Sequence, residues 1–199
     1  MGFTREQLES FRDAVIPDLL PPPGEGPPVK LLIVGINPGL WTAATRTPFA
    51  HPGNRFYPAL LAGGVIDREI DRVDGMSDAD RQYLLDRGIG MTNLVRRATA
   101  RADELSRDEL RAGGERLLRT VETYRPRVVA VAGITAYRTA FGDRTARPGR
   151  QERGIGTDDY RAQLWIVPNP SGLNAHETIA SLARTYRQPA EAAGIVPAS

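Results

Sequence analysis

The chain has 199 residues, a length typical of one α/β domain that folds without a stabilising metal or disulfide. Hydrophobic residues make up 41% of it and charged residues 25%, an ordinary balance for a globular protein. It has no cysteine, which excludes a disulfide scaffold and a thiolate nucleophile, and with only His51 and His176 a histidine metal centre is not expected. The longest apolar run, 128–134, is too short to cross a bilayer, and the first residues lack an apolar signal region, so we expect a cytoplasmic protein.

The formal net charge is only +2, but all except one of the 26 basic residues are arginine. A GC-rich genome alone produces such a bias, so the positions of the arginines are more informative than their number. Two clusters stand out, at 96–101 and 144–153, and an acidic stretch lies at 67–80. Guanidinium groups match phosphate oxygens, so these clusters fit docking to a nucleic acid backbone, although solvated arginine loops have the same pattern.

The N-terminal residues are predicted to form a helix and a stiff connector. Residues 4–7 make a capping-box pattern, and Leu8 and Val15 keep a helical spacing until the first proline. The stretch of prolines and glycines that follows can form neither a helix nor a strand. We therefore expect a helix and Pro-rich connector over 1–28 and a single domain over 29–199.

Short apolar segments alternate with helical patterns in the remainder of the chain. The predicted strands are 31–34, 90–92, 128–132 and 164–167, and the predicted helices are 54–61, 77–86, 106–124, 134–141 and 178–187. Alternation of this kind predicts parallel strands joined by right-handed crossovers. We expect a three-layer α/β/α sandwich with a central, mostly parallel sheet.

An asparagine follows three of the predicted strands. Asn37, Asn93 and Asn169 come just after strands that end near one edge of the sheet, where open α/β folds bind their ligands. Because an amide carries a donor and an acceptor, a cluster of three suits a neutral heterocycle. Asn-Pro is also a common turn dipeptide, so a purely structural interpretation of Asn37 and Asn169 stays open.

Four short motifs carry a resemblance to a known family. They are Gly-Ile-Asn-Pro-Gly-Leu at 35–40, Pro-Phe-Ala-His-Pro-Gly-Asn-Arg-Phe at 48–56, Gly-Met-Thr-Asn-Leu-Val at 90–95 and Asn-Pro-Ser-Gly-Leu at 169–173. In this order and spacing they resemble the mismatch-specific uracil/thymine-DNA glycosylases, a branch of the uracil-DNA glycosylase superfamily. The resemblance runs from about residue 29 to residue 188.

The resemblance implies a uracil-DNA glycosylase-like fold and a role in base excision repair. The expected enzyme is a monofunctional monomer that acts on double-stranded DNA of the nucleoid without a cofactor or a metal. It would flip uracil, and more weakly thymine or a damaged base, out of a mispair with guanine and hydrolyse the N-glycosidic bond through an oxocarbenium-like state. The lack of lysines near the motifs argues against strand cleavage by lyase chemistry.

The same resemblance assigns roles in the base pocket. Asn37 would hold the attacking water, and because an amide cannot act as a general base, we expect a slow enzyme. Phe49 would stack on the flipped base, with packing as a core residue beneath the first turn as its alternative role. Backbone N–H groups near Ile36 and Phe49 would donate to the uracil oxygens. Thr42 would lie beside C5 and favour uracil over thymine. The remaining substrate-binding candidates are Gly39, Asn93 and Asn169.

A second set of candidates would contact the duplex. Leu173 would be the wedge that fills the vacated stack, with Gly172 and Asn174 facing the widowed guanine and Ser171 donating to a phosphate. Relatives often carry Ser-Arg after the wedge, whereas this chain continues Asn-Ala-His. His176 is the candidate second plug, with helix capping or phosphate contact as its alternative roles. His51 is interpreted as structural, and Arg55 and the arginines of 144–153 as candidate phosphate contacts.

Two other functions stay open at this point. The chain fits a non-catalytic or very slow lesion-sensing DNA-binding module, and it also fits a glycosylase whose main substrate is another deaminated or adducted base. A nucleotide-phosphate hydrolase is disfavoured, because the sequence has no glycine-rich phosphate loop and no cluster of metal-binding carboxylates.

Overall fold

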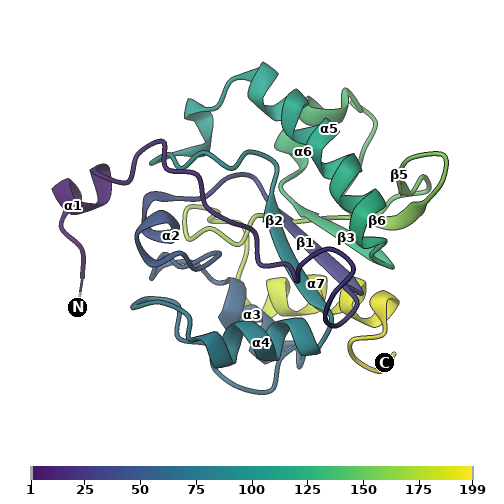
Figure 1. The fold of residues 1–199 in the computed structure, drawn as a ribbon, viewed down its shortest axis with the longest axis horizontal. Helices are drawn as coiled ribbons and strands as arrows, with labels where there is room; N and C mark the ends of the chain where they lie inside the picture. Colours follow the sequence, from purple (N-terminus) through teal and green to yellow (C-terminus); the bar gives the residue numbers. More distant parts are fainter. Residues whose placement is uncertain (1, 199) are drawn as a thin grey trace.

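The computed structural model describes residues 2–198 and is built around one mixed sheet (Figure 1). Four parallel strands form its centre, in the order β2 (Ile89–Asn93), β1 (Leu31–Gly35), β3 (Val128–Ala132) and β6 (Arg161–Val167). Two short strands, β4 (Gly149–Arg150) and β5 (Ile155–Gly156), pair antiparallel with the outer side of β6. The four predicted strands are confirmed, and β6 begins at Arg161 rather than at 164.

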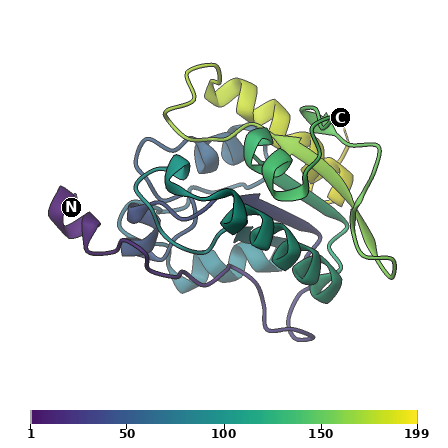
Figure 2. The same ribbon diagram turned by 90° about the horizontal axis from the view of Figure 1, so that it is seen from above.

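Helices cover both faces of this sheet (Figures 1 and 2). The helices α3 (Phe56–Ala62), α4 (Asp78–Asp86) and α7 (Ile179–Ala193) pack on one face, and α5 (Arg107–Tyr124) and α6 (Ile134–Phe141) pack on the other. Successive residues of a central strand enter opposite cores: Ile33 contacts the first group of helices and Leu32 the second. The predicted three-layer α/β/α sandwich is therefore confirmed.

The longer helices begin where their sequence signals predict. Ser77, Ser106 and Thr178 cap α4, α5 and α7, each hydroxyl accepting a hydrogen bond from the backbone N–H three residues further on. The helix α7 passes its predicted end at 187 because residues up to Ala193 are buried against the sheet. The short helices α2 (Leu40–Thr45) and η1 (Ala102–Glu104) were not predicted.

The N-terminal segment corrects one prediction. The helix α1 spans only Arg5–Glu9, although the apolar spacing favoured a longer one. Asp13 adopts a left-handed φ of 63°, and Val15 then pairs with Arg97 in an antiparallel bridge. An isolated helix of this length is marginal, so pairing with the loop after β2 replaces it. The domain boundary after residue 28 stays a prediction.

The fold brings the ends of the parallel strands to one edge. The strands β1, β2, β3 and β6 end at Gly35, Asn93, Ala132 and Val167, and the loops that follow carry the motifs singled out above. Within residues 2–198, no helix is long and apolar enough to be a membrane span.

Gly113 offers a test of how closely α5 packs on this edge. Helix propensity alone favours alanine there by about 1 kcal/mol, but a Cβ would overlap the carbonyl oxygen of Leu94 in the loop after β2. We expect Gly113→Ala to lower the free energy of unfolding by roughly 1–3 kcal/mol in a urea titration. Ala112→Gly, on the exposed side of α5, is the control and should cost about 0.5–1 kcal/mol. A Gly113→Ala protein as stable as wild type would contradict this packing.

Candidate active site

A cavity of about 600 Å³ opens at the carboxyl edge of the sheet. It is lined by ten of the twelve residues that the sequence singled out: Ile36, Asn37, Gly39, Thr42, Phe49, Asn93, Asn169, Ser171, Gly172 and Leu173. Asn174 and His176 are not part of the lining. The three asparagines that follow separate strands therefore share one cavity.

The described lining of the cavity contains no acidic side chain. Among the described residues that line the cavity there is no carboxylate, lysine or cysteine, and His51 and Arg101 are its titratable side chains. His51 is exposed, and its Nδ1 accepts a hydrogen bond from the backbone N–H of Gly53 at 3.0 Å, in keeping with its predicted structural role. No group of side chains suited to hold a metal ion occurs within residues 2–198. Besides His51 and Arg101, the polar groups of the described lining are amides, hydroxyls and backbone groups.

The amide of Asn37 is fixed from its nitrogen side. Nδ2 lies 3.1 Å from the carbonyl oxygens of Pro38 and Arg97 and 2.7 Å from Oγ1 of Thr99. Carbonyl oxygens only accept hydrogen bonds, so nitrogen rather than oxygen must face them. Oδ1 has no hydrogen-bond partner among residues 2–198, which leaves an oriented acceptor for a ligand or a water molecule.

Thr99 completes this arrangement, and sequence reasoning missed it. Its side chain is buried, and Oγ1 donates to the carbonyl oxygen of Arg101 at 2.7 Å. Because its hydrogen is used there, Oγ1 acts as an acceptor toward Asn37. The Thr99 backbone N–H also donates to Pro38 at 3.1 Å, which ties the two loops together. No periodicity or motif marks a single threonine in a loop, so only the folded structure identifies it.

Phe49 forms a wall of the cavity in a strained backbone conformation. Its φ of 55° lies in the left-handed region, which costs a non-glycine residue about 1–3 kcal/mol. One face of its ring stacks on Phe56 of α3, with centroids 4.1 Å apart and planes at 26°. The backbone N–H groups of Phe49 and Ile36 have no hydrogen-bond partner within residues 2–198. They can therefore donate hydrogen bonds to anionic or carbonyl oxygens of a ligand.

The side chain of Asn93 lies so close to the end of β1 that Gly35, the residue opposite it, has no room for a side chain. A Cβ on Gly35 would overlap Oδ1 of Asn93, so a larger residue would displace the amide. The guanidinium of Arg116, on α5, donates to the backbone carbonyl oxygens of Asn93 and Leu94. Burial lowers the pKa of Arg116, whose charge is partly compensated by these carbonyl dipoles. The end of β2 is thereby held against α5.

On the other side of the cavity, the side-chain oxygen of Asn169 accepts a hydrogen bond from its own loop. Oδ1 accepts from the backbone N–H of Ser171 at 3.0 Å, which leaves Nδ2 as the group that can donate to a ligand. Thr42 is buried, and its Oγ1 lies 3.4 Å from the backbone nitrogen of Ala50, which donates to it.

Leu173 is the most exposed large apolar side chain at the cavity mouth. It is 90% exposed, although the loop around it is well bonded, with its own backbone N–H donating to Oγ of Ser171 at 3.3 Å. A single exposed apolar side chain is common on protein surfaces, so the position of Leu173 at the mouth of the cavity is what makes it a candidate contact.

Arg55 holds that loop from a distant part of the chain. Its Nη2 donates to the carbonyl oxygens of Ser171 and Asn174, both at 2.7 Å, and its Nη1 donates to the carbonyl oxygen of Glu177. Sequence analysis expected Arg55 to contact phosphate, but its guanidinium is used on these three carbonyl groups. Arg55 therefore links the loop that carries Phe49 to the loop that carries Leu173.

The last two candidates lie outside the cavity. The backbone N–H of Asn174 donates to Ser171 and its carbonyl accepts from Arg55, so both groups would have to exchange partners to meet a base. His176 is exposed. The residue that caps α7 is Thr178, so the capping alternative for His176 is wrong, and its role as a second plug stays a prediction.

The N-terminal segment forms the outer wall. Leu8 of α1 and Trp41 of α2 both line the cavity, and the Trp41 ring meets the ring of Phe3 edge-on at 5.1 Å. The indole N–H of Trp41 donates to the carbonyl oxygen of Val73 at 2.9 Å. No role was predicted for Trp41, whose ring lies at one side of the entrance.

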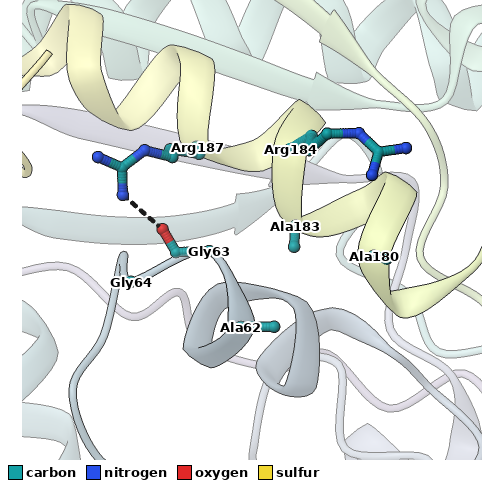
Figure 3. Close-up of a pocket in the computed structure, with 7 residues that line it drawn as sticks. All are labelled: Ala62, Gly63, Gly64, Ala180, Ala183, Arg184 and Arg187. Carbon is teal, nitrogen blue, oxygen red and sulfur yellow. Dashed lines mark hydrogen bonds between the residues drawn. The ribbon is translucent and has the colours of Figure 1, made fainter. Parts of the chain in front are cut away.

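A second hollow, of about 450 Å³, lies between α3 and α7 (Figure 3). Small residues line it, and Arg187 donates to the carbonyl oxygen of Gly63 at 2.8 Å while Arg184 points the other way. A Cβ on Gly63 would lie 2.9 Å from the carbonyl oxygen of Ala183, so the two helices meet closely here. None of the predicted site residues lies in this seam between helices.

The comparison with known families agrees with the geometry of the first cavity. A family model described as the uracil-DNA glycosylase superfamily matches residues 23–190, most of the chain. The chain belongs to the uracil-DNA glycosylase superfamily. Membership implies DNA glycosylase activity on uracil-type lesions, and DNA as the macromolecule on which the protein acts. The predicted family is thus confirmed at the level of the superfamily, while the mismatch-specific branch stays a proposal.

Thr99 gives a direct test of the Asn37 geometry in this glycosylase fold. Thr99→Val keeps the shape of the side chain but removes the closest acceptor of Asn37 Nδ2, which is left with the carbonyl oxygens of Pro38 and Arg97. It also removes the hydroxyl donor to the Arg101 carbonyl, and each lost hydrogen bond is worth about 0.5–1.5 kcal/mol. If the amide orientation matters for the reaction, uracil excision under single-turnover conditions should fall tenfold or more. Thr99→Ser restores the hydroxyl and should recover most of the rate. Wild-type activity in a folded Thr99→Val protein would contradict this role.

Proposed function

We propose that the protein is a monofunctional, mismatch-specific uracil-DNA glycosylase. It hydrolyses the N-glycosidic bond of uracil, and more weakly of thymine or damaged bases, mispaired with guanine in duplex DNA. The observation that carries the proposal is the oriented amide of Asn37, whose Nδ2 is held by three acceptors and whose Oδ1 is left without a partner. The protein leaves an abasic site and acts as a monomer in base excision repair.

The first step is placement of a water molecule by Asn37. Oδ1 accepts a hydrogen bond from the water and directs its lone pair at C1′ of the flipped nucleotide. An amide cannot remove the proton in the way that a carboxylate does, and general-base help is worth about 10²–10⁴-fold, so the reaction is slow. It depends on a good leaving group, with positive charge developing on the sugar before the water attacks.

The second contribution is stabilisation of the departing base. The unpaired backbone N–H groups of Ile36 and Phe49 donate to the uracil oxygens, whose negative charge grows as the bond breaks. Asn169 Nδ2 and the amide of Asn93 complete the polar contacts, and the free face of Phe49 stacks on the ring. Thr42, beside C5, leaves little room for the thymine methyl group, which is worth about 1–3 kcal/mol in favour of uracil.

Access to the base comes from Leu173. Flipping a nucleotide costs a few kcal/mol and costs least at a mismatch, which favours G·U over A·U. The exposed Leu173 enters the gap in the stack, Ser171 donates to a phosphate, and Gly172 lies beside the widowed guanine. The cavity lining offers no lysine for a Schiff base, so the enzyme is expected to stop at the abasic site.

The second candidate is a lesion sensor that binds the flipped base without efficient hydrolysis. The absence of a carboxylate from the described cavity lining favours it, because nothing there removes a proton from water. The two functions differ in one observable, release of the base.

The test is excision from labelled duplexes that carry G·U, A·U, G·T or hypoxanthine, with single-stranded uracil alongside, followed by alkali. We expect cleavage after alkali, strongest at G·U, and resistance to EDTA. Asn37→Ala should abolish turnover with little loss of mismatch binding, whereas Gln82→Ala, an exposed amide on α4, should behave as wild type. Binding to the mismatch without cleavage by the wild-type protein would favour the sensor, and equal rates for Asn37→Ala would exclude Asn37 from the reaction.

The expected pH profile of the excision rate follows from the absence of a carboxylate in the described lining of the cavity. Because no carboxylate is predicted to gain or lose a proton during the step, the single-turnover rate at G·U should stay level between about pH 5 and pH 8. Asn37→Asp would set a carboxylate against the carbonyl oxygens of Pro38 and Arg97, which raises the pKa of that group. Repulsion from these carbonyl oxygens turns the carboxylate away from the water, so it cannot act as a general base. The activity should therefore be weak at the higher pH and recover as the acid is protonated and donates to the carbonyl oxygens. An acidic limb in the wild-type profile would contradict the proposed water-positioning role.

A further inference from the structure

The arginine-rich segment 143–153 lies beside the site at the outer edge of the sheet. Within it, β4 pairs with the carboxyl-terminal end of β6, where Gly149 lies opposite Ile166. Ile166 is only three positions before Asn169. The segment therefore begins its pairing next to the strand that carries the cavity loop. From there it runs along the free edge of β6 to β5, away from the carboxyl end.

Internal hydrogen bonds hold the backbone of this segment. Asp143 Oδ1 accepts from the hydroxyl of Thr145 at 2.7 Å and from the backbone N–H groups of Thr145 and Ala146 at 3.0 and 3.1 Å, and these hydrogen bonds lower the pKa of that carboxyl. Arg138 donates to the carbonyl oxygen of Ala146 at 2.6 Å, and Gln151 Nε2 donates to the carbonyl oxygen of Gly149 at 2.8 Å. Asp143 is thus held by the turn and makes no direct ion pair with an arginine of the segment, although its negative charge remains beside Arg144.

The arginine side chains of the segment take no part in these hydrogen bonds. Arg144, Arg147, Arg150 and Arg153 are all exposed, and none has a hydrogen bond or ion pair through its guanidinium within residues 2–198. Elsewhere, arginines near the cavity are already used: Arg55 and Arg116 hold carbonyl oxygens, and Arg97 pairs with Glu109 at 2.8 Å.

The opposing charge along this edge is small. Glu152 is exposed within the segment, and Asp158 and Asp159 lie at the far end, beyond β5, where Asp158 is 3.5 Å from Arg161. The part nearest to the cavity has Arg144, Arg147 and Arg150 against the single carboxylate of Asp143, and therefore keeps a net positive charge. Its guanidinium groups have the geometry that matches phosphate oxygens.

We propose that Arg144, Arg147 and Arg150 form a docking surface for the phosphate backbone of the duplex flanking the lesion. The inference rests on the proposed function, because it places the flipped nucleotide in the cavity beside β6. Contacts of this kind carry no sequence information; they set the orientation of the duplex and supply affinity that falls with salt. Positive side chains on an edge strand also protect against edge-to-edge aggregation, and this alternative is an outcome of the test below.

The experiment measures binding of an undamaged, fluorescently labelled duplex over a range of salt concentrations, together with single-turnover excision at saturating enzyme. The patch variant is Arg147→Gln with Arg150→Gln. The matched control is Lys30→Gln with Arg119→Gln, two exposed cations, of which Lys30 lies beside the amino end of β1, away from the cavity. Each phosphate contact contributes about 0.9 to the slope of log K against log salt, so the patch variant should lose about 1.8. The control should keep the wild-type slope, and the excision rate at saturation should not change in either variant.

The outcomes test the docking surface separately from the proposed glycosylase function. A reduced slope in the patch variant alone supports the docking surface, even if the wild-type protein releases no uracil, in which case only the proposed function falls. An unchanged slope overturns the docking surface whatever the excision result, and aggregation of the variant with unchanged binding assigns these arginines to protection of the sheet edge. Failure of the wild-type protein to bind duplex DNA would overturn both proposals.

Discussion

The arrangement of the site depends on a set of hydrogen bonds that hold one amide group in one orientation. The nitrogen of Asn37 faces the carbonyl oxygens of Pro38 and Arg97 and the hydroxyl of Thr99, all acting as acceptors. An asparagine in a solvated loop could turn either end toward a ligand, but this one has no donor on its nitrogen side. The same hydrogen bonds tie the loop after β1 to the loop after β2, so the position of the acceptor is set by the sheet itself. Pre-organisation of this kind removes the cost of orienting a group at the moment of reaction.

Buried or half-buried guanidinium groups give the loops around this amide their shape. Arg116 holds the end of β2 against α5, and Arg55 holds the loop of Leu173 through three carbonyl oxygens. Both use a fork of donors to satisfy backbone groups that would otherwise need water. The exposed Leu173 is therefore presented on a fixed loop, and little conformational entropy is lost when it meets a partner. The arginines of 144–153 make no such contact, and the proposed docking surface for DNA rests on their free guanidinium groups.

Much of this could be predicted from the sequence, because the features are local. Continuous apolar segments predicted the four central strands, helical patterns beginning at 77, 106 and 178 predicted the starts of α4, α5 and α7, and the asparagines after the strands predicted a shared edge. The features that were missed depend on distant residues: Thr99 lies 62 positions from Asn37. The early end of α1 was missed because Val15 pairs with Arg97, and the left-handed φ of Phe49 has no signal in its own side chain. Superfamily membership is established by the match over 23–190, whereas the choice of lesion rests on side chains whose effect must be measured.

The most direct test of this account is a crystal structure of the protein bound to a duplex with a non-hydrolysable 2′-fluoro-deoxyuridine opposite guanine. The account predicts the uracil ring stacked on the free face of Phe49. A water molecule should lie within hydrogen-bond distance of Asn37 Oδ1 and be aligned with C1′. Nδ2 should keep its bonds to Pro38, Arg97 and Thr99. A uracil bound elsewhere, or an Asn37 side chain turned so that its nitrogen meets the base or the water, would contradict it.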